Sequence, residues 1–382
     1  MNVAFYCPLK PPDHPNPSGD RRLARLFIRA ISMGGHRVMA TPPFRSRDAL
    51  GNRDRQRRIQ RLGKRLARRL IHRWETCVPG DRPQIWFTYH VYHKAPDWLG
   101  PAVARALGIP YVVAEASVAP KRAGGPWDLG LQGTVQAVRA ADAILSLNPD
   151  DEQCVRPMMK AGAEFMCFPP FIDTDHFEAN VPRQEARSSL RETLGVDPGR
   201  PWLIAIGMMR HGDKLASYQM LGQALSLALD AEWTLLVVGD GAARAEVEQT
   251  LAPLGRERLR FLGRLESRSL ANVLGACDLL VWPAINEAFG MSLLEAQALG
   301  VPVVAGGERG VSAVVKDGET GLLVEAGAPE AFTAAVRRLI ESSDLRLRMG
   351  RAARERVLRE HDLGMAARGL DRLFLRLRES SA

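Results

Sequence analysis

The sequence of 382 residues lacks the features of a membrane-spanning or disulfide-stabilised protein. It contains no run of eighteen or more apolar residues, so no segment is long enough to cross a bilayer as a helix. The five cysteines are scattered, and no two of them form a Cys-x-x-Cys pair, which argues against a zinc site and a disulfide framework. The first residues resemble a strand and not a signal peptide. These absences predict a cytoplasmic protein, in which thiols stay reduced.

Positive charge is concentrated in one segment. The chain carries a net charge of +9, and the segment from Arg45 to Arg73 holds twelve Lys or Arg and two Asp, a local balance of +10. The rest of the chain is therefore close to neutral. A nucleic-acid partner is not expected, because aromatic residues are not interleaved with the basic ones.

The same segment has the spacing of a basic amphipathic helix. Two interpretations remain open. One is an interfacial helix that binds anionic lipid at the inner face of a membrane. The other is a helix packed on its own domain with a solvated basic face. The apolar stripe expected for this helix consists of Ile59, Leu62, Leu66 and Leu70.

Strands alternate with helices along the whole chain, with six expected strands in each half. This alternation predicts an α/β protein with two doubly wound, Rossmann-like domains, each built on a parallel sheet. Ligands of such sheets bind at the carboxyl ends of the strands. The pair Pro169-Pro170 bars a helix and suits a connection between the two halves.

The stretch from Leu279 to Gly300 is predicted to form a strand, a short loop and a helix. Glu287 lies in the loop, Glu295 lies about one turn into the helix, and Gly290 lies between them. The first N–H groups of a helix suit a phosphate or a sugar hydroxyl. Flanked by two carboxylates, they suit a ligand with one anionic end and several hydroxyls, such as a sugar nucleotide. For two glutamates at such a spacing alone, a solvated loop residue and a helix-surface residue are the better explanation; the glycine and the preceding strand favour the site.

In this setting the Glu-x7-Glu pattern resembles the signature of family 4 retaining glycosyltransferases, which have the GT-B fold of two Rossmann-like domains facing each other across a cleft. The resemblance is close from about Pro201 to Arg356 and extends to the first half only in plan. It implies an acceptor domain over residues 1–170 and a donor domain over residues 171–361 that binds a nucleotide-diphospho-sugar. It also implies that a final helix, within residues 362–382, packs back on the first domain.

The resemblance assigns roles to loops at strand ends. Arg210 and Lys214 would hold the donor phosphates, although the usual Arg-x4-Lys-Gly stretch is one residue shorter here and Leu215 replaces its glycine. Glu287 would hold the transferred sugar and Glu295 the ribose. The other donor-side residues would be Gly207, Gly239 and Gly241 around the nucleotide, Arg264 and Leu265 beside the base, and the amides of Phe289, Gly290 and Met291 at the phosphate.

In the first half, the resemblance draws attention to the ends of three expected strands. Gly19 would let the backbone approach the donor, and Ser18 or Asp20 would cap the helix that follows. His90 matches a position where many family members have a histidine near the sugar, although a lone histidine is equally explained as a satisfied polar residue. Glu115 ends another strand and is a further candidate.

The predicted reaction is the retaining transfer of a sugar from a nucleotide-diphospho-sugar to a glycan, lipid or small-molecule acceptor, with no metal or other cofactor. Asp173-x-Asp175 follows the double proline and not a strand end, so it is interpreted as part of a turn and not as a metal site. Two alternatives remain: a sugar-nucleotide epimerase of the same fold, and a non-catalytic sugar-nucleotide-binding protein.

Overall fold

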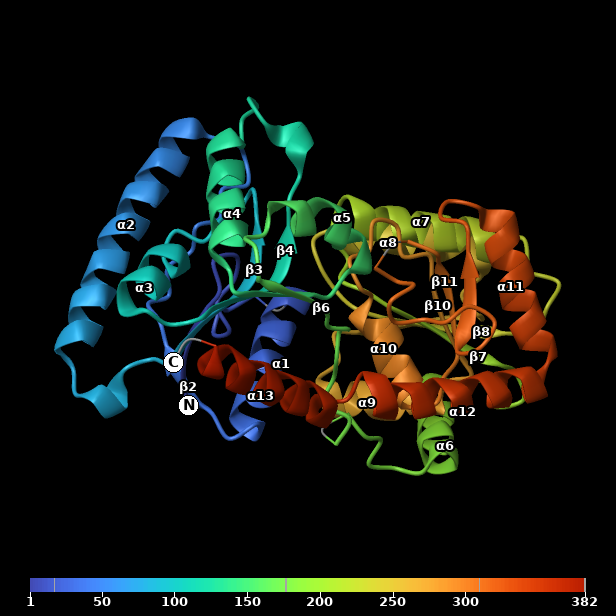
Figure 1. The fold of residues 1–382 in the computed structure, drawn as a ribbon. Coiled ribbons are helices and arrows are strands. Elements are labelled where there is room, and N and C mark those ends of the chain that lie inside the picture. Colours follow the sequence, from blue (N-terminus) through green and yellow to red (C-terminus); the bar gives the residue numbers. More distant parts are fainter. Residues whose placement is uncertain (17, 176, 309, 381–382) are drawn as a thin grey trace. The chain divides into compact units, whose positions relative to one another are not determined.

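The computed structural model describes residues 1–16, 18–175, 177–308 and 310–380 (Figure 1). The chain forms two compact units. The first contains Met1–Pro169 and Leu363–Ala382, and the second contains Pro170–Asp362. The sequence analysis placed the boundary one residue later and began the final segment at residue 362. The last two residues of that segment lie outside the described ranges.

The first unit is built on a parallel sheet of six strands in the order β2-β1-β3-β4-β5-β6. Its inner strands are buried along most of their length, as expected for a parallel sheet covered on both faces. Phe5 and Phe87 pack with Phe27 and Phe374 on one face, whereas Trp86 meets Trp74 on the other. The strands are β1 (Asn2–Tyr6), β2 (Arg37–Ala40), β3 (Ile85–Tyr92), β4 (Tyr111–Ser117), β5 (Ala143–Ser146) and β6 (Glu164–Cys167).

The helices of the first unit fall into two groups. The final helix α13 (Leu363–Glu379) lies beside α1 (Gly19–Met33), and α2 (Arg53–Thr76) packs beside α3 (Gly100–Leu107) and α4 (Asp128–Ala140) (Figure 1). A short helix, α5 (Glu152–Val155), precedes β6. The residues after Asp362 thus complete the layer that α1 begins.

The second unit has a parallel sheet in the order β12-β11-β10-β7-β8-β9. Its strands are β7 (Trp202–Ile206), β8 (Thr234–Val238), β9 (Leu259–Gly263), β10 (Leu279–Trp282), β11 (Val303–Gly306) and β12 (Gly321–Val324). Its helices are α6 (Arg183–Leu194), α7 (Asp213–Ser226), α8 (Arg244–Leu251), α9 (Ser267–Ala276), α10 (Met291–Ala298), α11 (Pro329–Glu341) and α12 (Ser343–Glu360).

Each sheet has one point where the strand order reverses. In the first unit this point lies between β1 and β3, and in the second it lies between β7 and β10. Connections leave such neighbouring strands in opposite directions, which opens a crevice outside their carboxyl ends where ligands of parallel sheets bind. The topology therefore marks one candidate place in each unit.

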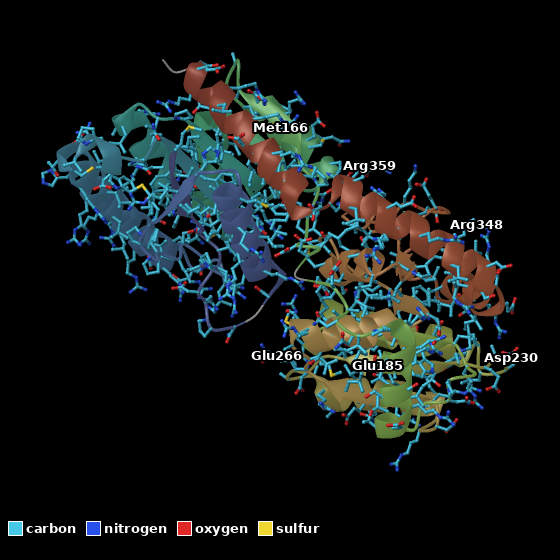
Figure 2. The ribbon with its side chains drawn as sticks, turned by 90° about the horizontal axis from the view of Figure 1, so that it is seen from below. Met166, Glu185, Asp230, Glu266, Arg348 and Arg359 are labelled. Carbon is cyan, nitrogen blue, oxygen red and sulfur yellow. The ribbon has the colours of Figure 1, made fainter. Side chains whose placement is uncertain are left out.

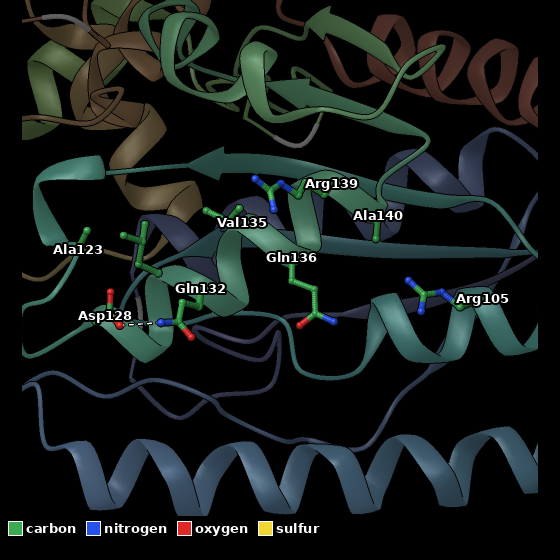
Figure 3. Close-up of a pocket in the computed structure, with 9 residues that line it drawn as sticks. Arg105, Ala123, Asp128, Gln132, Val135, Gln136, Arg139 and Ala140 are labelled. Carbon is green, nitrogen blue, oxygen red and sulfur yellow. Dashed lines mark hydrogen bonds between the residues drawn. The ribbon is translucent and has the colours of Figure 1, made fainter.

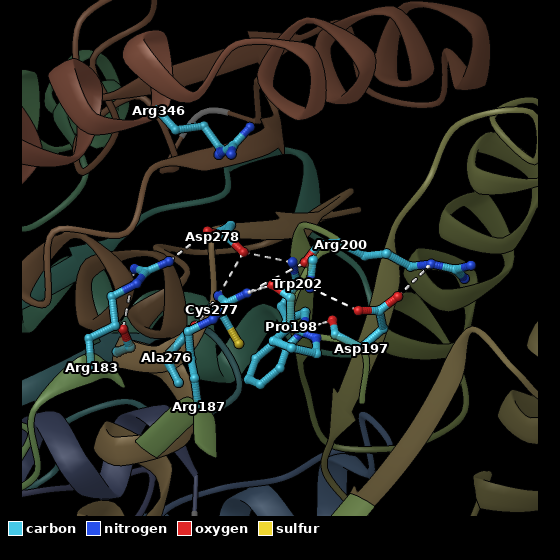
Figure 4. Close-up of polar contacts among 12 residues, drawn as sticks. Arg183, Arg187, Asp197, Pro198, Arg200, Trp202, Ala276, Cys277, Asp278 and Arg346 are labelled. Atoms are coloured by element: carbon cyan, nitrogen blue, oxygen red, sulfur yellow. Dashed lines mark hydrogen bonds and ion pairs between the residues drawn. The ribbon is translucent and has the colours of Figure 1, made fainter. Parts of the chain in front are cut away.

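A charged cluster fastens the opposite, amino-terminal end of the second sheet (Figure 4). Asp278, just before β10, accepts hydrogen bonds from Arg183 at 2.6 Å, from Arg187 at 2.9 Å and from the backbone N–H of Trp202 at 2.8 Å. The Arg187 guanidinium also lies 4.0 Å from the centre of a Trp202 ring. Since this cluster joins α6 to β7 and β10 away from the crevice, its role is structural. Glu185 of α6 and Arg348 of α12, which are labelled in Figure 2, are exposed on the second unit.

The basic helix α2 packs through a face that matches the predicted stripe in part: Leu70 lies in the core, and Ile59 and Leu66 are partly buried against it. Its buried residues are Gln56, Gly63, Ala67, Leu70 and Trp74, whereas Leu62 is 46% exposed. A Cβ on Gly63 would lie 2.5 Å from the Cβ of Trp98, so the small residues allow close packing. The predicted stripe was wrong at Leu62, because helical periodicity over the full 24 residues turns Gly63 and Ala67 inward.

The outward face of α2 is almost entirely cationic. Arg61, Arg65, Arg68 and Arg69 are exposed, and Leu70 is only 4% exposed because it belongs to the core. The helix therefore offers charge, but little apolar surface, to an outside partner. None of the helices in the described ranges is long and apolar enough to span a bilayer.

Candidate functional site

The crevice of the second unit brings together two residues that the sequence analysis singled out. Lys214, in the first turn of α7, donates a hydrogen bond to the carboxylate of Glu287, in the loop after β10. The indole N–H of Trp282 donates to the same carboxylate oxygen at 3.2 Å, and the Lys214 ammonium lies 5.1 Å from the centre of the Trp282 ring. The Lys214 and Glu287 side chains are only 15% and 17% exposed, so the charges are held rigidly.

The loop that carries Glu287 has an unusual backbone. Ala284 and Asn286 adopt φ values of 57° and 49°, a left-handed conformation that is rare for residues with a side chain. Gly290 follows with φ of 68° and is the N-cap of α10. A Cβ there would lie 2.6 Å from Leu293, so a glycine is required before the helix begins.

Hydrogen bonds to the start of α7 hold this loop in place. The Asn286 side chain donates to Asp213 at 3.0 Å, and the backbone N–H of Ile285 donates to the Ser217 hydroxyl at 3.1 Å. The loops after β7 and β10 thus form one structural element. Strained backbone that is fixed in this way is typical of binding and catalytic sites.

The glycines predicted to line the nucleotide have a packing role in the structure. A Cβ on Gly239 would lie 1.9 Å from the carbonyl oxygen of Gly207, and a Cβ on Gly241 would lie 2.2 Å from that of Met209. Gly207 itself packs on the Trp282 ring, 2.7 Å from the position of a Cβ. These glycines let the loops after β7 and β8 approach each other; contact with a nucleotide stays a prediction.

The remaining residues predicted on the donor side differ in how far they are buried. Glu295, in α10, is 3% exposed. Arg210 and Arg264 are exposed, and Arg210 is not part of the ion pair between Lys214 and Glu287. The partly buried members are Leu265, Phe289 and Met291.

The crevice of the first unit holds the predicted His90. Its Nδ1 lies 2.9 Å from Oδ1 of Asp20, the second residue of α1. Burial disfavours the charged forms of both groups, but their hydrogen bond and the neighbouring charges together outweigh it, so the pKa of His90 is raised and the pKa of Asp20 is lowered. The histidine is thus a partner in a dyad and not an isolated polar residue.

Ser18, and not Asp20, caps the N-terminus of α1. The Ser18 hydroxyl accepts a hydrogen bond from the backbone N–H of Arg21 at 3.2 Å and is the N-cap, which leaves the Asp20 side chain to His90. Gly19 is exposed, and a Cβ there would meet no described atom within 4 Å. Its approach to the donor stays a prediction.

Other polar features lie apart from these crevices. The Thr174 hydroxyl, next to Asp173, donates to Asp362 at 2.6 Å. Across the described ranges, no group of three or more His, Cys, Asp or Glu side chains is arranged to hold a metal ion. A cavity of about 510 Å³ lies along α4 in the first unit, where Asp128 accepts a hydrogen bond from Gln132 (Figure 3). None of its lining residues was predicted as a site residue.

Sequence reasoning missed the residues that position the predicted ones. Trp282 was assigned only to a strand, although it contacts both Lys214 and Glu287. Asp213 and Ser217 were not singled out, and Asp20 was considered only as a helix cap. The sequence held one signal for two of these residues. Each is an aspartate that directly follows a glycine at the start of a helix: Asp20 follows Gly19, and Asp213 follows Gly212.

Two doubly wound parallel sheets, one in each unit, are the architecture of the GT-B fold. Residues 196–356 match the family described as glycosyl transferases group 1. The predicted resemblance to family 4 glycosyltransferases is confirmed by this match and by the relatives below.

The similar curated proteins include glycosyltransferases of Xylanimonas and Streptomyces. A D-inositol 3-phosphate glycosyltransferase of Xylanimonas cellulosilytica is 33% identical over 229 residues, which cover 58% of this chain and 54% of that protein. An alpha-D-kanosaminyltransferase of Streptomyces kanamyceticus is 28% identical over 218 residues, covering 57% and 56%. The chain thus spans about half the length of these relatives.

Solved structures share the fold over nearly the whole chain. The sucrose-phosphate synthase of Thermosynechococcus elongatus has a TM-score of 0.75 at 18% identity and covers 100% of both chains. HepE of Anabaena in complex with UDP has a TM-score of 0.74 at 16% identity and covers 98% of this chain and 99% of its own. The predicted α/β fold class is confirmed by this likeness and by the two sheets.

Proposed function

We propose that the protein is a retaining glycosyltransferase that moves a sugar from a nucleotide-diphospho-sugar to an acceptor without a divalent metal ion. The observation that carries the proposal is the contact between Lys214 and Glu287 beside the N-terminus of α10. It places a cation, a carboxylate and free helix N–H groups at the reversal point of a parallel sheet.

These groups match the charge changes of sugar transfer. Cleavage of the anomeric carbon–oxygen bond leaves a diphosphate that gains negative charge. Lys214, the exposed Arg210 and the first amides of α10 supply positive charge for that leaving group. Glu287 accepts hydrogen bonds from hydroxyls of the transferred sugar, and Glu295 from those of the ribose.

The donor and acceptor are proposed at different levels of detail. HepE, a structural neighbour, binds UDP and UDP-glucose, so uridine nucleotides are the first probes. A relative named D-inositol 3-phosphate glycosyltransferase favours a small polar acceptor. A glycan and a lipid remain the other acceptor classes.

A donor screen tests the proposal. UDP-, GDP- and ADP-sugars are incubated with the purified protein in EDTA, and release of nucleoside diphosphate is measured with and without candidate acceptors. We expect release with one donor, no dependence on magnesium, and strong loss in Lys214→Met. Restoration by magnesium after chelation would contradict the metal-independent mechanism. A changed sugar nucleotide without release indicates an epimerase, and saturable binding without turnover indicates a binding protein.

We also propose that the outward face of α2 docks the protein on an anionic membrane surface, such as the cytoplasmic leaflet. Four exposed arginines (Arg61, Arg65, Arg68 and Arg69) support this proposal. Each cation near such a surface contributes about 1 kcal/mol, and the contribution falls off within a Debye length. Because Leu62 is the one strongly exposed apolar residue on this face, the attraction is electrostatic and reversible.

Vesicle sedimentation tests the docking surface. We expect binding to vesicles that contain phosphatidylserine, little binding to neutral vesicles, and release by raised salt. Reversal of the four arginines to Glu should abolish binding and leave donor hydrolysis intact. The matched control reverses four exposed arginines of the second unit: Arg338, Arg348, Arg351 and Arg354. If the wild type ignores anionic vesicles at low salt, or if both quadruple variants lose binding equally, α2 is only a solvated helix face.

A further inference from the structure

Two neighbouring strands of the first unit carry the same backbone irregularity at the same level. His90 in β3 and Glu115 in β4 adopt φ values of 66° and 61°. The ladder pairs Tyr89 with Ala114 and Val91 with Ala116, so the two residues lie side by side between these pairs. A left-handed conformation is costly for either side chain, and strain of this kind is retained where the surrounding fold imposes it.

The Glu115 side chain is buried with part of its hydrogen-bonding capacity unused. It is 7% exposed, and its Oε2 atom has no hydrogen-bond partner among the residues that the structure describes. Buried polar atoms are nearly always paired, so an unpaired carboxylate oxygen needs an explanation. Its position near the carboxyl end of β4 is where a ligand of this sheet would supply the missing partner.

The charges around Glu115 restrict what that ligand can be. The pKa of the Glu115 carboxyl group is affected by the charges of three side chains: His90 of β3, Asp20 of α1, and Asp151, which precedes α5. The charge of Glu115 in turn affects the pKa of Tyr89. Burial raises the pKa of Glu115 to about 7, against the opposing charge of His90. Near neutral pH the Glu115 side chain is therefore present both as a protonated carboxyl, which donates a hydrogen bond, and as a carboxylate, which only accepts.

This arrangement suits a hydroxyl and not a phosphate. Two of the three charged neighbours are acidic, so a phosphate would be repelled. A sugar hydroxyl both donates and accepts, and it matches a carboxyl group that can do either beside an imidazole. The second unit, by contrast, offers Lys214 and helix amides to the anionic part of a donor.

We propose that Glu115, together with the His90–Asp20 pair, forms a hydroxyl-binding site that holds a sugar ring, either that of the donor or that of the acceptor. The proposal rests on the proposed function and adds Glu115 as a specificity-determining residue. Glu115 forms this contact directly, while Asp20 orients His90 through its hydrogen bond.

Two substitutions separate contact from folding. Glu115→Asn tolerates a positive φ but is too short to reach the ligand, whereas Glu115→Gln keeps the length and one acceptor and donor. Glu75→Gln, on the exposed face of α2, is the control. Calorimetry compares UDP with UDP-glucose, or with the nucleotide pair that the donor screen identifies. We expect unchanged nucleoside diphosphate affinity in every variant.

The expected loss distinguishes the source of the ring. If the ring belongs to the donor, Glu115→Asn lowers nucleotide-sugar affinity about three- to tenfold and Glu115→Gln restores most of it. If the ring belongs to the acceptor, donor affinity is unchanged and the acceptor KM of Glu115→Asn rises by a similar factor. Wild-type values for both quantities in Glu115→Asn would overturn the proposal.

Failure of the proposed function gives a different result. In that case the wild type binds no nucleotide sugar, and saturation-transfer NMR with free glucose and myo-inositol reads the site alone. Signals that vanish in Glu115→Asn support a hydroxyl site independent of glycosyl transfer. Absent wild-type signals, or signals unchanged in Glu115→Asn, overturn the site as well.

Discussion

The ion pair of the second unit leads to a prediction with a definite sign. In the ligand-free protein, Glu287 neutralises the Lys214 ammonium that we propose for the donor phosphates. Replacing Glu287 with Gln keeps an acceptor for the Trp282 N–H but removes the negative charge. Glu287→Gln should therefore bind a nucleoside diphosphate more tightly, while it loses part of the affinity contributed by the sugar.

The magnitude follows from the exposure of the two side chains. Two unit charges about 4 Å apart interact with about 1 kcal/mol in bulk water and about 4 kcal/mol at an effective dielectric constant of about 20. Lys214 and Glu287 are 15% and 17% exposed, and water screens the pair in part. We expect a gain of about 1 to 2 kcal/mol for the diphosphate, or about five- to thirty-fold in Kd. The lost hydroxyl contact costs about 1 kcal/mol for the sugar.

Calorimetry with UDP and UDP-glucose, or the pair found in the screen, measures both effects. Glu192→Gln, on the exposed surface of α6, is the matched control and should behave as the wild type. Lys214→Met should weaken both ligands. If folded Glu287→Gln binds the diphosphate no better than the wild type, Lys214 is not the phosphate-binding group and the reasoning fails.

Three further predictions concern Glu295, Asp278 and Glu115. Glu295→Gln should weaken nucleotide-sugar binding by about 1–3 kcal/mol, because one acceptor oxygen replaces two at the ribose; unchanged calorimetric affinity would remove Glu295 from the site. Asp278→Ala should destabilise the second unit by about 3 kcal/mol, since Arg183 and Arg187 lose their partner; an unchanged melting temperature would contradict this. Glu115→Gln should stabilise the protein by about 2 to 3 kcal/mol at pH 8 but not at pH 4. Burial raises the folded-state pKa of Glu115 to about 7, so its stabilisation is present below the unfolded pKa and is lost as pH rises through about 7. Thermal unfolding at both pH values checks the sign, and an equal gain at each would refute it.

The fold was predictable because its local signals agree with its tertiary contacts. Six strands were expected in each half, and each sheet has six, since most of the strands are short apolar runs ended by a turn or helix signal. The packing of α2 was predictable only in part: Ile59, Leu66 and Leu70 contact the core as expected, but Leu62 does not. Its inward face is defined by Gly63 and Ala67, which have little hydrophobic signal and matter only because Trp98 lies against them.

The candidate site was predictable only where a pattern lies within one loop. Glu287 and Gly290 share a loop, so their spacing was informative, and the structure places Lys214 against Glu287 although the loop of Lys214 departs from the family pattern. The contact of Trp282 with Lys214 and Glu287 depends on the order of the strands in the sheet, so it could not be predicted from the sequence. The pairing of His90 with Asp20 joins residues 70 positions apart for the same reason.

Backbone strain locates both crevices without any motif. The described residues with positive φ that are not glycine are His90, Glu115, Ala284 and Asn286. The first pair lies near the carboxyl ends of β3 and β4, and the second pair lies in the loop after β10. Asn286 and His90 are of types that adopt this conformation more often than others, whereas Glu115 and Ala284 are not, so the sequence gives little warning of it. Since such strain persists only where surrounding contacts impose it, its confinement to these strand ends argues that each unit has its own preformed site. In the first unit the strained residues supply imidazole and carboxyl groups, which suit hydroxyls. In the second they shape the loop that holds Glu287 against Lys214, which suits a charged phosphate and its sugar.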